Sequence, residues 1–408
     1  MDFSFNQEDD ELRTQVRAFI GDHLNHDVLR ELKIERDTGE RGPLARDFFD
    51  KVYERGWFAL SWPKDRGGQG KSVMAQFIVE EEFYRAIELR VGGAGSGAPG
   101  ILVCGTEEQK RHYLPKVIKR EIVFAQGYTE PGCGTDLAGI QCRAIRDAEH
   151  YVINGQKIFV TDAHTATDIY LMVRTDPASR RHQGLSILLV PMNTLGITVR
   201  PLWTIQNEPE APLGTTYGER RVNEVFFEDV KVPLSCLLGD EGDGWAVATR
   251  GLNLDRVGAF RYVISIMRDE DMVNWLNTDP AAAEKRDDPV VRDKVAEMWI
   301  EGQVCRLMTM RSMSIAQRNA DFVYEGAAEK VWAPEHGVRA SEAYSQILGP
   351  HAQLLSSSAQ TVAGGLFAHN MLGAFQSTVN HGSVHAMRDQ IAKRGLNMPR
   401  AARQKAGG

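Results

Sequence analysis

The 408-residue chain lacks any hydrophobic run long enough to cross a bilayer. A transmembrane helix needs roughly 18 or more consecutive apolar residues, and here Arg, Lys, Asp or Glu interrupts every apolar stretch. The first ten residues are acidic and polar, the opposite of a secretory or mitochondrial leader. We therefore expect a protein that inserts into no membrane and stays in the cytoplasm.

Cysteine pairs and clustered positive charge are also missing. The five cysteines are odd in number and have no CxxC spacing, so neither a disulfide framework nor a thiolate metal site is indicated. Lys and Arg number 48 against 55 Asp and Glu, which gives a net charge of −7 with no basic block. Because nucleic-acid binding depends on clustered positive charge, we expect no nucleic-acid partner.

The composition that remains is that of an ordinary globular protein. Hydrophobic residues make up 42% of the sequence and charged residues 25%, which leaves disorder and fibrous structure without support. At roughly 100 to 200 residues per domain, the length predicts two to four domains.

The first third of the chain has the period of helices. Apolar residues recur at helical spacing from residue 8 to about 120, and the glycine-rich run at 92–100 predicts a break. A further helix is predicted from Thr106, whose side chain can form a capping box with Gln109. We expect that helix to end at Pro115.

Near residue 122 the period changes to that of strands. Short β-branched and apolar runs stand between turn signals, and Asn154-Gly155 is typical of a hairpin turn. The strand pattern ends near Val232-Pro233. From Trp245 to about 394 the pattern is helical again, in long amphipathic stretches such as 359–372.

The order of helices, strands and helices predicts an α+β multi-domain fold. We expect an all-helical N-terminal domain at 1–122, an antiparallel β-barrel-like domain at 123–238 and a C-terminal helical bundle at 239–408. A doubly wound nicotinamide-binding sheet needs strands that alternate with helices, so the layout argues against that fold.

Two motif matches are expected to be decoys. Gly95–Gly100 reads GxGxxG, but it follows a helical stretch and contains Pro99. His381 and His385 are four residues apart and could share a helix face, yet the Glu of HExxH and a third ligand are missing. We expect no metal site.

The most informative segment joins the helical region to the strands. Residues 124–136 read FAQGYTEPGCGTD and combine hydroxyls, an acid and two closely spaced glycines. Such a turn can expose backbone N–H groups to a polar ligand, because glycine permits close approach. Taken alone, the segment could equally be a structural turn.

Read with its neighbours, the segment resembles the acyl-CoA dehydrogenase family. The family pattern TEPGxGSD is similar to Thr129–Asp136, and the pattern NGxKxWIT is similar to Asn154–Thr161. Three more matches, at 105–115, 225–233 and 395–400, extend the resemblance over nearly the whole chain. It implies an N-terminal helical domain, a central β-barrel-like domain and a C-terminal four-helix bundle.

The resemblance also implies a reaction. FAD would lie between the β domain and the C-terminal helices, a carboxylate would take the α-proton of an acyl-CoA thioester, and the β-hydrogen would leave as hydride to flavin N5. An electron-transferring flavoprotein would then accept the electrons. The cofactor-binding residues implied by position are Gln126, Tyr128, Thr129, Gly134, Thr135, Phe159 (usually Trp), Thr161, Gln346, Gly349, Ser383 and His385.

The catalytic base departs from the usual family pattern. Most members carry a Glu near the C-terminus, where this chain has His381. A smaller branch places the carboxylate in a segment like LNxER, and here that segment is Leu252–Arg256, with Asp255 as the candidate base and Arg256 beside it. His381 would supply a backbone N–H to the thioester carbonyl, and its side chain is the alternative base. An Asp-Arg pair on a helix can also be a plain surface ion pair.

The family patterns whose residues reach a neighbouring subunit's FAD are also poorly matched. The RxxFG pattern has no counterpart near 286–292, and QxxGG survives only at 346–350. The sequence thus resembles the branch that acts on steroid side chains or ring compounds, some of whose members are unlike-subunit tetramers. We expect a homotetramer, with a hetero-oligomer that contains a non-catalytic or FAD-sharing subunit as the alternative. Other flavin chemistry, such as an oxidase or nitroalkane-type enzyme, also stays open.

A bulky or alicyclic acyl group is expected for three reasons. Asp255 is one methylene shorter than Glu, the run 92–98 is made of small residues, and a long polar insertion spans 207–221. A shifted carboxylate requires a differently placed α-carbon, and small side chains leave room for a ring. Alternatively, the glycines serve a turn and the insertion is a solvated loop.

Overall fold

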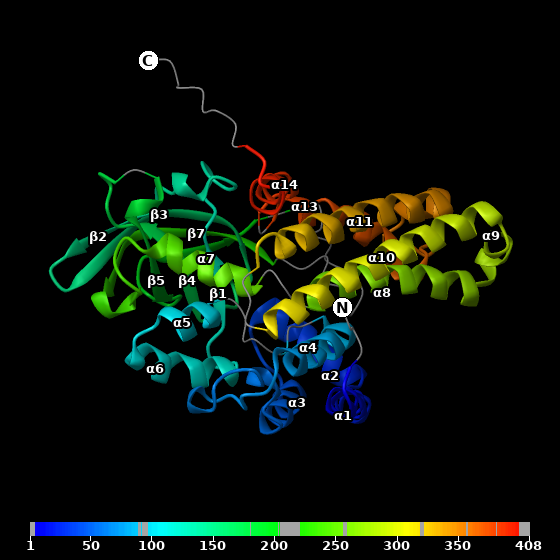
Figure 1. Ribbon diagram of the computed structural model, residues 1–408, viewed down its shortest axis with the longest axis horizontal. Coiled ribbons are helices and arrows are strands. Elements are labelled where there is room, and N and C mark those ends of the chain that lie inside the picture. Colours follow the sequence, from blue (N-terminus) through cyan, green and yellow to red (C-terminus); the bar gives the residue numbers. More distant parts are fainter. Residues whose placement is uncertain are drawn as a thin grey trace, which may run out of the picture.

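The computed structural model of the chain describes residues 5–88, 91, 97–179, 181–202, 204, 221–255, 259–318, 322–355, 358–380 and 382–399, and for 37, 181, 250–255 and 259–261 only the backbone. Along the chain, helices precede and follow the strands of a sheet, as expected (Figure 1). The domain limits at 122 and 238 stay a prediction.

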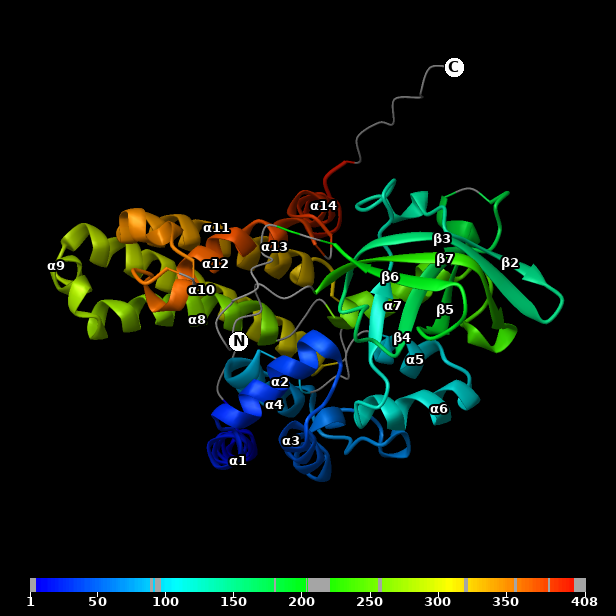
Figure 2. The same ribbon diagram turned by 180° about the vertical axis from the view of Figure 1, so that it is seen from behind.

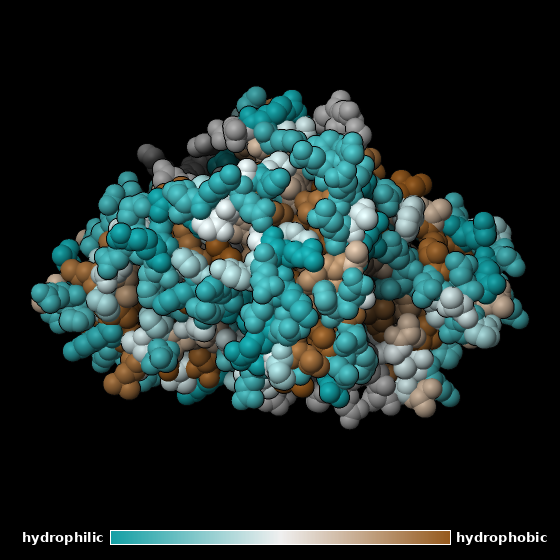
Figure 3. All heavy atoms as spheres, turned by 90° about the horizontal axis from the view of Figure 1, so that it is seen from below, coloured by the Kyte–Doolittle hydropathy of each residue, from teal (hydrophilic) through white to brown (hydrophobic). Residues whose placement is uncertain are grey.

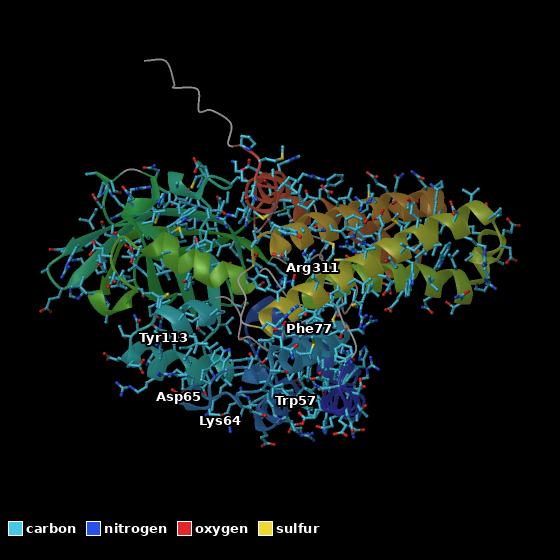
Figure 4. The ribbon with its side chains drawn as sticks, viewed as in Figure 1. Trp57, Lys64, Asp65, Phe77, Tyr113 and Arg311 are labelled. Carbon is cyan, nitrogen blue, oxygen red and sulfur yellow. The ribbon has the colours of Figure 1, made fainter. Side chains whose placement is uncertain are left out.

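The N-terminal helices pack around an aromatic core. Phe19, Phe48, Trp57 and Phe83 are buried and their rings meet at 5.2 to 6.1 Å between centroids, and Figure 4 labels Trp57 inside this layer. The elements are α1 (Gln7–His23), α2 (His26–Thr38), α3 (Pro43–Glu54), short 3₁₀ turns at Trp57–Ala59 and Lys64–Arg66, α4 (Val73–Ile87), α5 (Ala98–Cys104) and α6 (Glu107–Ile118).

The start of α6 confirms the sequence prediction, and its end corrects it. Thr106 and Gln109 form the capping box. Pro115 does not stop the helix, which continues to Ile118, because Leu114, Val117 and Ile118 are buried in the core and compensate for the one N–H that proline lacks. The predicted break between helices at 92–100 is shorter than expected, because α5 already begins at Ala98. Pro99 occupies the first turn of α5, where a backbone N–H is not needed.

The sheet is antiparallel except where β1 and one residue pair of β2 run parallel to β4. Its order is β6-β7-β3-β2-β4-β5-β8, with β1 paired to β4 off this path. The strands are β1 (Phe124–Gly127), β2 (Arg143–Asp147), β3 (His150–Thr161), β4 (Asp168–Arg174), β5 (Leu185–Pro191), β6 (Ile197–Pro201), β7 (Val222–Pro233) and β8 (Leu237–Leu238). One-turn 3₁₀ helices occur at Leu137–Gly139, Arg181–Gly184 and Leu234–Cys236.

Asn154-Gly155 is not the hairpin turn that the sequence predicts. Strand β3 runs straight through it, and the turn between β2 and β3 falls at Ala148 and Glu149. At Gly155 the pairing with β7 shifts register, φ is +146°, and an added Cβ would lie 2.7 Å from the Cα of Cys142. This glycine therefore serves a bulge where two strands approach closely.

The C-terminal part is helical. Its elements are α7 (Gly244–Asp255), α8 (Ala259–Thr278), Pro280–Ala282, α9 (Ala283–Arg286), α10 (Pro289–Ala316), α11 (Glu325–Leu348), Gly349–Gln353, Ala363–Gly365, α12 (Leu366–Ala374), α13 (Gln376–Val379), α14 (Val384–Gln390) and a π turn at Ile391–Gly395. The helix predicted at 359–372 begins only at Leu366, because Gly364 and Gly365 adopt positive φ angles just before it.

The three parts lie side by side. The sheet occupies one end of the molecule, the long helices α8, α10 and α11 extend away from it toward α9, and the N-terminal helices cover the junction (Figures 1 and 2). Phe77 of α4 stacks on Tyr262 of α8 at 6.1 Å, which joins the first and third parts (Figure 4). The face in Figure 3 is mainly hydrophilic, with hydrophobic residues in small separate groups.

Within the described ranges, no helix is both long and apolar enough to span a membrane. All five cysteines are free thiols.

Candidate functional site

The structure brings the two glycine-containing sequence motifs together. The loop that follows β1 lies against β3, and the backbone N–H of Ile158 donates to the carbonyl oxygen of Thr129 at 2.9 Å. Residues that stand almost thirty positions apart in the chain are therefore neighbours across one backbone hydrogen bond.

Strand β3 turns an aromatic side chain out of the sheet beside this contact. The pairing of β3 with β7 shifts register between Lys157 and Val160, and Phe159 lies in that shift with φ +57°. Its side chain is 61% exposed, whereas Val160 is buried. A left-handed conformation costs a bulky residue roughly 1–2 kcal/mol, and such strain is typical of functional sites. The bulge therefore redirects Phe159 toward solvent.

The same loop and the same strand also carry the polar residues of the two motifs. Gly134, Thr135 and Thr161 are exposed, while Thr129 is half-buried. An added Cβ on Gly134 would meet only the methyl group of Thr129, at 3.7 Å, so the loop is open on that side. We call Thr129, Gly134, Thr135, Phe159 and Thr161 the platform. Gln126 and Tyr128, also half-buried, lie at its β1 side.

A clamp that the sequence analysis missed holds the end of β3. Asp162, which follows Thr161, has φ +56° and accepts two hydrogen bonds from Arg221, at 2.8 and 2.6 Å. Its backbone N–H donates to the carbonyl oxygen of Arg221 at 2.7 Å. The clamp fixes Thr161 against β7, and no local pattern indicates it, because the partners lie 59 residues apart.

Thiols near the platform are held in their neutral form. Burial, and then the charge of Glu130, raises the pKa of Cys133 above its ordinary value. Burial raises the pKa of Cys142 to about 11. Neither side chain is therefore a ready thiolate nucleophile.

The C-terminal candidates do not gather at the platform within one chain. Gln346 accepts a hydrogen bond from Lys294, in the second turn of α10, and Gly349 caps α11 with φ +65°. That end of the bundle lies by α9, away from the sheet (Figure 1). Ser383 caps α14 by accepting from the N–H of Ala386 at 3.3 Å.

The helix α14 lies between the sheet and the long helices in both ribbon views (Figures 1 and 2). His385 is exposed on it. Arg256 and His381 lie outside the described residues, as does the side chain of Asp255, whose backbone ends α7. The small-residue run at 92–96 and the insertion at 205–220 are likewise outside them.

The glycines of the GxGxxG match that the structure describes serve packing. An added Cβ on Gly97 would lie 3.1 Å from the ring of Tyr170, and one on Gly100 would lie 2.6 Å from its hydroxyl oxygen. They let α5 approach the sheet. His385 lies on α14, which begins at Val384. His381 lies outside the described residues, so the idea that the two histidines share a helix face stays untested. The described part of the chain contains no group of three His, Cys, Asp or Glu side chains placed to hold a metal ion.

Comparisons with known proteins agree on one family. Residues 6–121, 125–220 and 242–396 match the family models for the N-terminal, middle and C-terminal domains of acyl-CoA dehydrogenase. Acyl-CoA dehydrogenase FadE29 of Mycobacterium tuberculosis is 31% identical and the match covers 96% of this chain and 97% of that protein. Acyl-CoA dehydrogenase FadE26 of the same organism is 29% identical, over 99% and 100% of the two chains.

Solved structures give the same result. The structure described as a Tcur3481-Tcur3483 steroid ACAD is 31% identical, has a TM-score of 0.83 and covers 98% of this chain and 100% of its own. The ChsE4-ChsE5 complex from Mycobacterium tuberculosis is 29% identical, with a TM-score of 0.84 over 98% and 100% of the chains.

Proposed function

Since this chain belongs to the acyl-CoA dehydrogenase family, we propose that it binds FAD on the platform and oxidises a bulky or alicyclic acyl-CoA. The observation that carries the proposal is the contact between the Thr129 loop and β3, beside which Phe159 stands exposed in a strained conformation. Family members typically bind FAD, and a flat ring with polar edges fits an exposed aromatic ring flanked by hydroxyls.

The residues proposed to hold the cofactor come from the loop and from β3. The hydroxyls of Thr129, Thr135 and Thr161 and the open backbone at Gly134 would contact its polar edge, and Phe159 would cover one face of the ring. When bound, FAD supplies a hydride acceptor, and the protein supplies orientation and exclusion of water.

Asp255 is the proposed base for the α-proton of the substrate. The reference pKa of an Asp side chain is about 3.9, which makes a weak base in water, and burial beside a thioester raises such a pKa. The backbone N–H of His381 would hold the thioester carbonyl and so stabilise the charge that develops when the proton leaves. Arg256 would orient the carboxylate, and the His381 side chain is the alternative base.

The proposed acyl group contains rings. Support comes from the structure described as a steroid ACAD, which aligns with 98% of this chain, and from Asp255, whose shorter side chain calls for a displaced α-carbon. Misplacement by about 1 Å can cost about 100-fold in rate, so the base and the acyl group must match.

We also propose that the chain assembles into a homotetramer. The alternative is a complex with an unlike chain that shares FAD or is itself non-catalytic. Gln346 and Gly349 favour an oligomer of either kind, because they lie at the α9 end of the bundle and would need a neighbouring subunit to reach a cofactor. A stable, flavin-loaded monomer in light scattering would contradict both forms. An electron-transferring flavoprotein is the proposed electron acceptor.

The base assignment is tested with Asp255→Asn. The variant should bind FAD and acyl-CoA normally but lose substrate-dependent bleaching of the flavin by about 100-fold or more, on the scale of a lost general base. Asp22→Asn, at an exposed position of α1, is the matched control and should bleach normally. Normal bleaching by Asp255→Asn would refute the assignment.

The cofactor proposal has its own test. Denatured pure protein should release FAD at a ratio near one per proposed site. A colourless preparation that no reconstitution restores, alone or with a partner chain, would contradict it.

A further inference from the structure

We propose that a buried ion pair between Lys157 and Glu130 positions the platform and thereby sets the affinity for FAD. Both side chains are buried, so neither would contact the cofactor directly, and they are positioning residues. The inference rests on the proposed function, since it concerns how that same site is held in shape.

Lys157 lies on β3, two residues before Phe159, and its side chain is fully buried. Its ammonium group donates to Oε1 of Glu130 at 2.7 Å and to the carbonyl oxygen of Tyr128 at 3.1 Å. The next residue along β3, Ile158, donates its N–H to the carbonyl oxygen of Thr129. Two successive residues of the strand therefore bind two successive carbonyls of the loop.

Glu130 extends this link to a third segment. Its side chain is 6% exposed, Oε2 accepts from the N–H of Gln141 at 2.7 Å, and Oε1 accepts from the N–H of Cys142 at 2.9 Å as well as from Lys157. Its backbone exchanges two hydrogen bonds with Cys133, at 2.9 and 3.1 Å. One carboxylate thus joins the start of the loop, the segment that follows the loop, and β3.

A second buried cation holds the far end of the loop. Arg174 of β4 donates to the carbonyl oxygens of Ile140 at 2.9 Å and Ala138 at 2.8 Å. Between these two anchors, Gly134 and Thr135 are exposed. The loop is therefore fixed at both ends in the interior while its middle faces solvent, as a preformed binding edge requires.

Stability alone does not account for the pair. Taking two charges out of water is costly, and apolar residues of similar volume often replace a buried ion pair without loss of stability. What apolar side chains cannot supply is a donor for the Tyr128 carbonyl and acceptors for the Gln141 and Cys142 N–H groups. The distinctive consequence of the pair is thus the fixed separation between the loop and Phe159.

The test separates positioning from folding with three variants. Glu130→Gln keeps the shape of the side chain but leaves the Lys157 ammonium without its counter-charge. Lys157→Met removes the ammonium. The double variant Glu130→Gln/Lys157→Met removes both charges, so its melting temperature should recover toward wild type. All three should raise the Kd for FAD by about 10- to 100-fold, the scale of a displacement near 1 Å.

Glu82→Gln is the matched control. Glu82 is also a 6%-exposed carboxylate in ion pairs, with Arg13 and Arg17, but it lies in the N-terminal helices. This variant should lower the melting temperature of the apoprotein and leave the Kd for FAD within about twofold of wild type.

The measurements are FAD titrations of apoprotein by quenching of flavin fluorescence, and apoprotein melting curves. Weakened FAD binding by the double variant, despite a recovered melting temperature, supports the inference. Wild-type affinity in the Glu130 and Lys157 variants overturns it, and so does an equal loss of affinity in Glu82→Gln. If the wild-type chain binds no FAD, the proposed function fails; if it binds FAD and the variants bind equally well, only this inference fails.

Discussion

Replacing Phe159 by glycine should separate the stability of the fold from the function of the platform. Phe159 is 61% exposed and has φ +57°, so its side chain contributes little core packing and its backbone is strained. An ordinary core Phe, when truncated, costs about 3–5 kcal/mol of stability. Phe159→Gly should behave very differently.

The expected change in stability is close to zero. Glycine relieves roughly 1–2 kcal/mol of left-handed strain. Against this, it adds freedom to the unfolded chain, at about 0.5–1 kcal/mol, and removes the buried minority of the ring, at about 1 kcal/mol. These terms leave the apoprotein within about 1 kcal/mol of wild type. Loss of a stacking ring should weaken binding of a flat ligand by about 1–3 kcal/mol, which is about 5- to 150-fold in Kd.

The assay pairs melting curves of the apoprotein with FAD titrations. Ala148→Gly is the control, because Ala148 also has a positive φ, +49°, but lies in the exposed β2–β3 turn. It should melt at or slightly above the wild-type temperature and bind FAD normally. A Phe159→Gly apoprotein that melts as low as a core variant, or one that binds FAD with wild-type affinity, would refute the reasoning.

Three further predictions concern stability. Burial, and then Glu270, raises the pKa of Asp271 to about 6. The folded chain therefore holds this proton more tightly than the unfolded chain, and the resulting stabilisation is lost as pH rises from about 4 to 6. Above pH 6, Asp271→Asn should be more stable than wild type by about 1 kcal/mol, after allowance for partial exposure, and should melt at a higher temperature. Near pH 4 the two proteins should melt at the same temperature. Gly100→Ala should destabilise the protein by about 1–3 kcal/mol and lower its melting temperature, because the new methyl group would lie 2.6 Å from the Tyr170 hydroxyl oxygen. Adding Tyr170→Phe should restore part of the lost stability. Gln109→Ala should cost about 1–2 kcal/mol of stability, because it removes the acceptor for the Thr106 N–H and the donor for two partly buried carbonyls, those of Ser235 and Leu237. An unchanged melting temperature would contradict this.

Short sequence signals predicted the structures that depend only on neighbouring residues. Thr106 and Gln109 are three residues apart and form their capping box within one turn, so the sequence suffices. Pro115 failed as a helix stop and Asn154-Gly155 failed as a hairpin turn. The burial of Val117 and the close approach of Cys142 depend on tertiary packing, which no short stretch of sequence contains. Tertiary packing overrode both local preferences.

In the candidate site, too, some features could be predicted from the sequence and others could not. The loop and strand motifs were visible as sequence patterns, and the structure adds that one backbone hydrogen bond joins Thr129 to Ile158. The contacts of Glu130 with Lys157 and of Asp162 with Arg221 span 27 and 59 residues. Only the folded sheet shows such contacts, because oppositely charged residues at those separations are common in any sequence.

The most direct test of the central claim is an anaerobic titration of the FAD-loaded protein with acyl-CoA thioesters. Steroid-like and alicyclic acyl-CoAs are compared with butyryl-, octanoyl- and palmitoyl-CoA, and the loss of visible flavin absorption is followed. We predict rapid bleaching, with the fastest flavin reduction by a ring-containing thioester. Fastest reduction by any unbranched chain would contradict the proposed substrate class, and a flavin that no acyl-CoA bleaches would contradict the dehydrogenase mechanism itself.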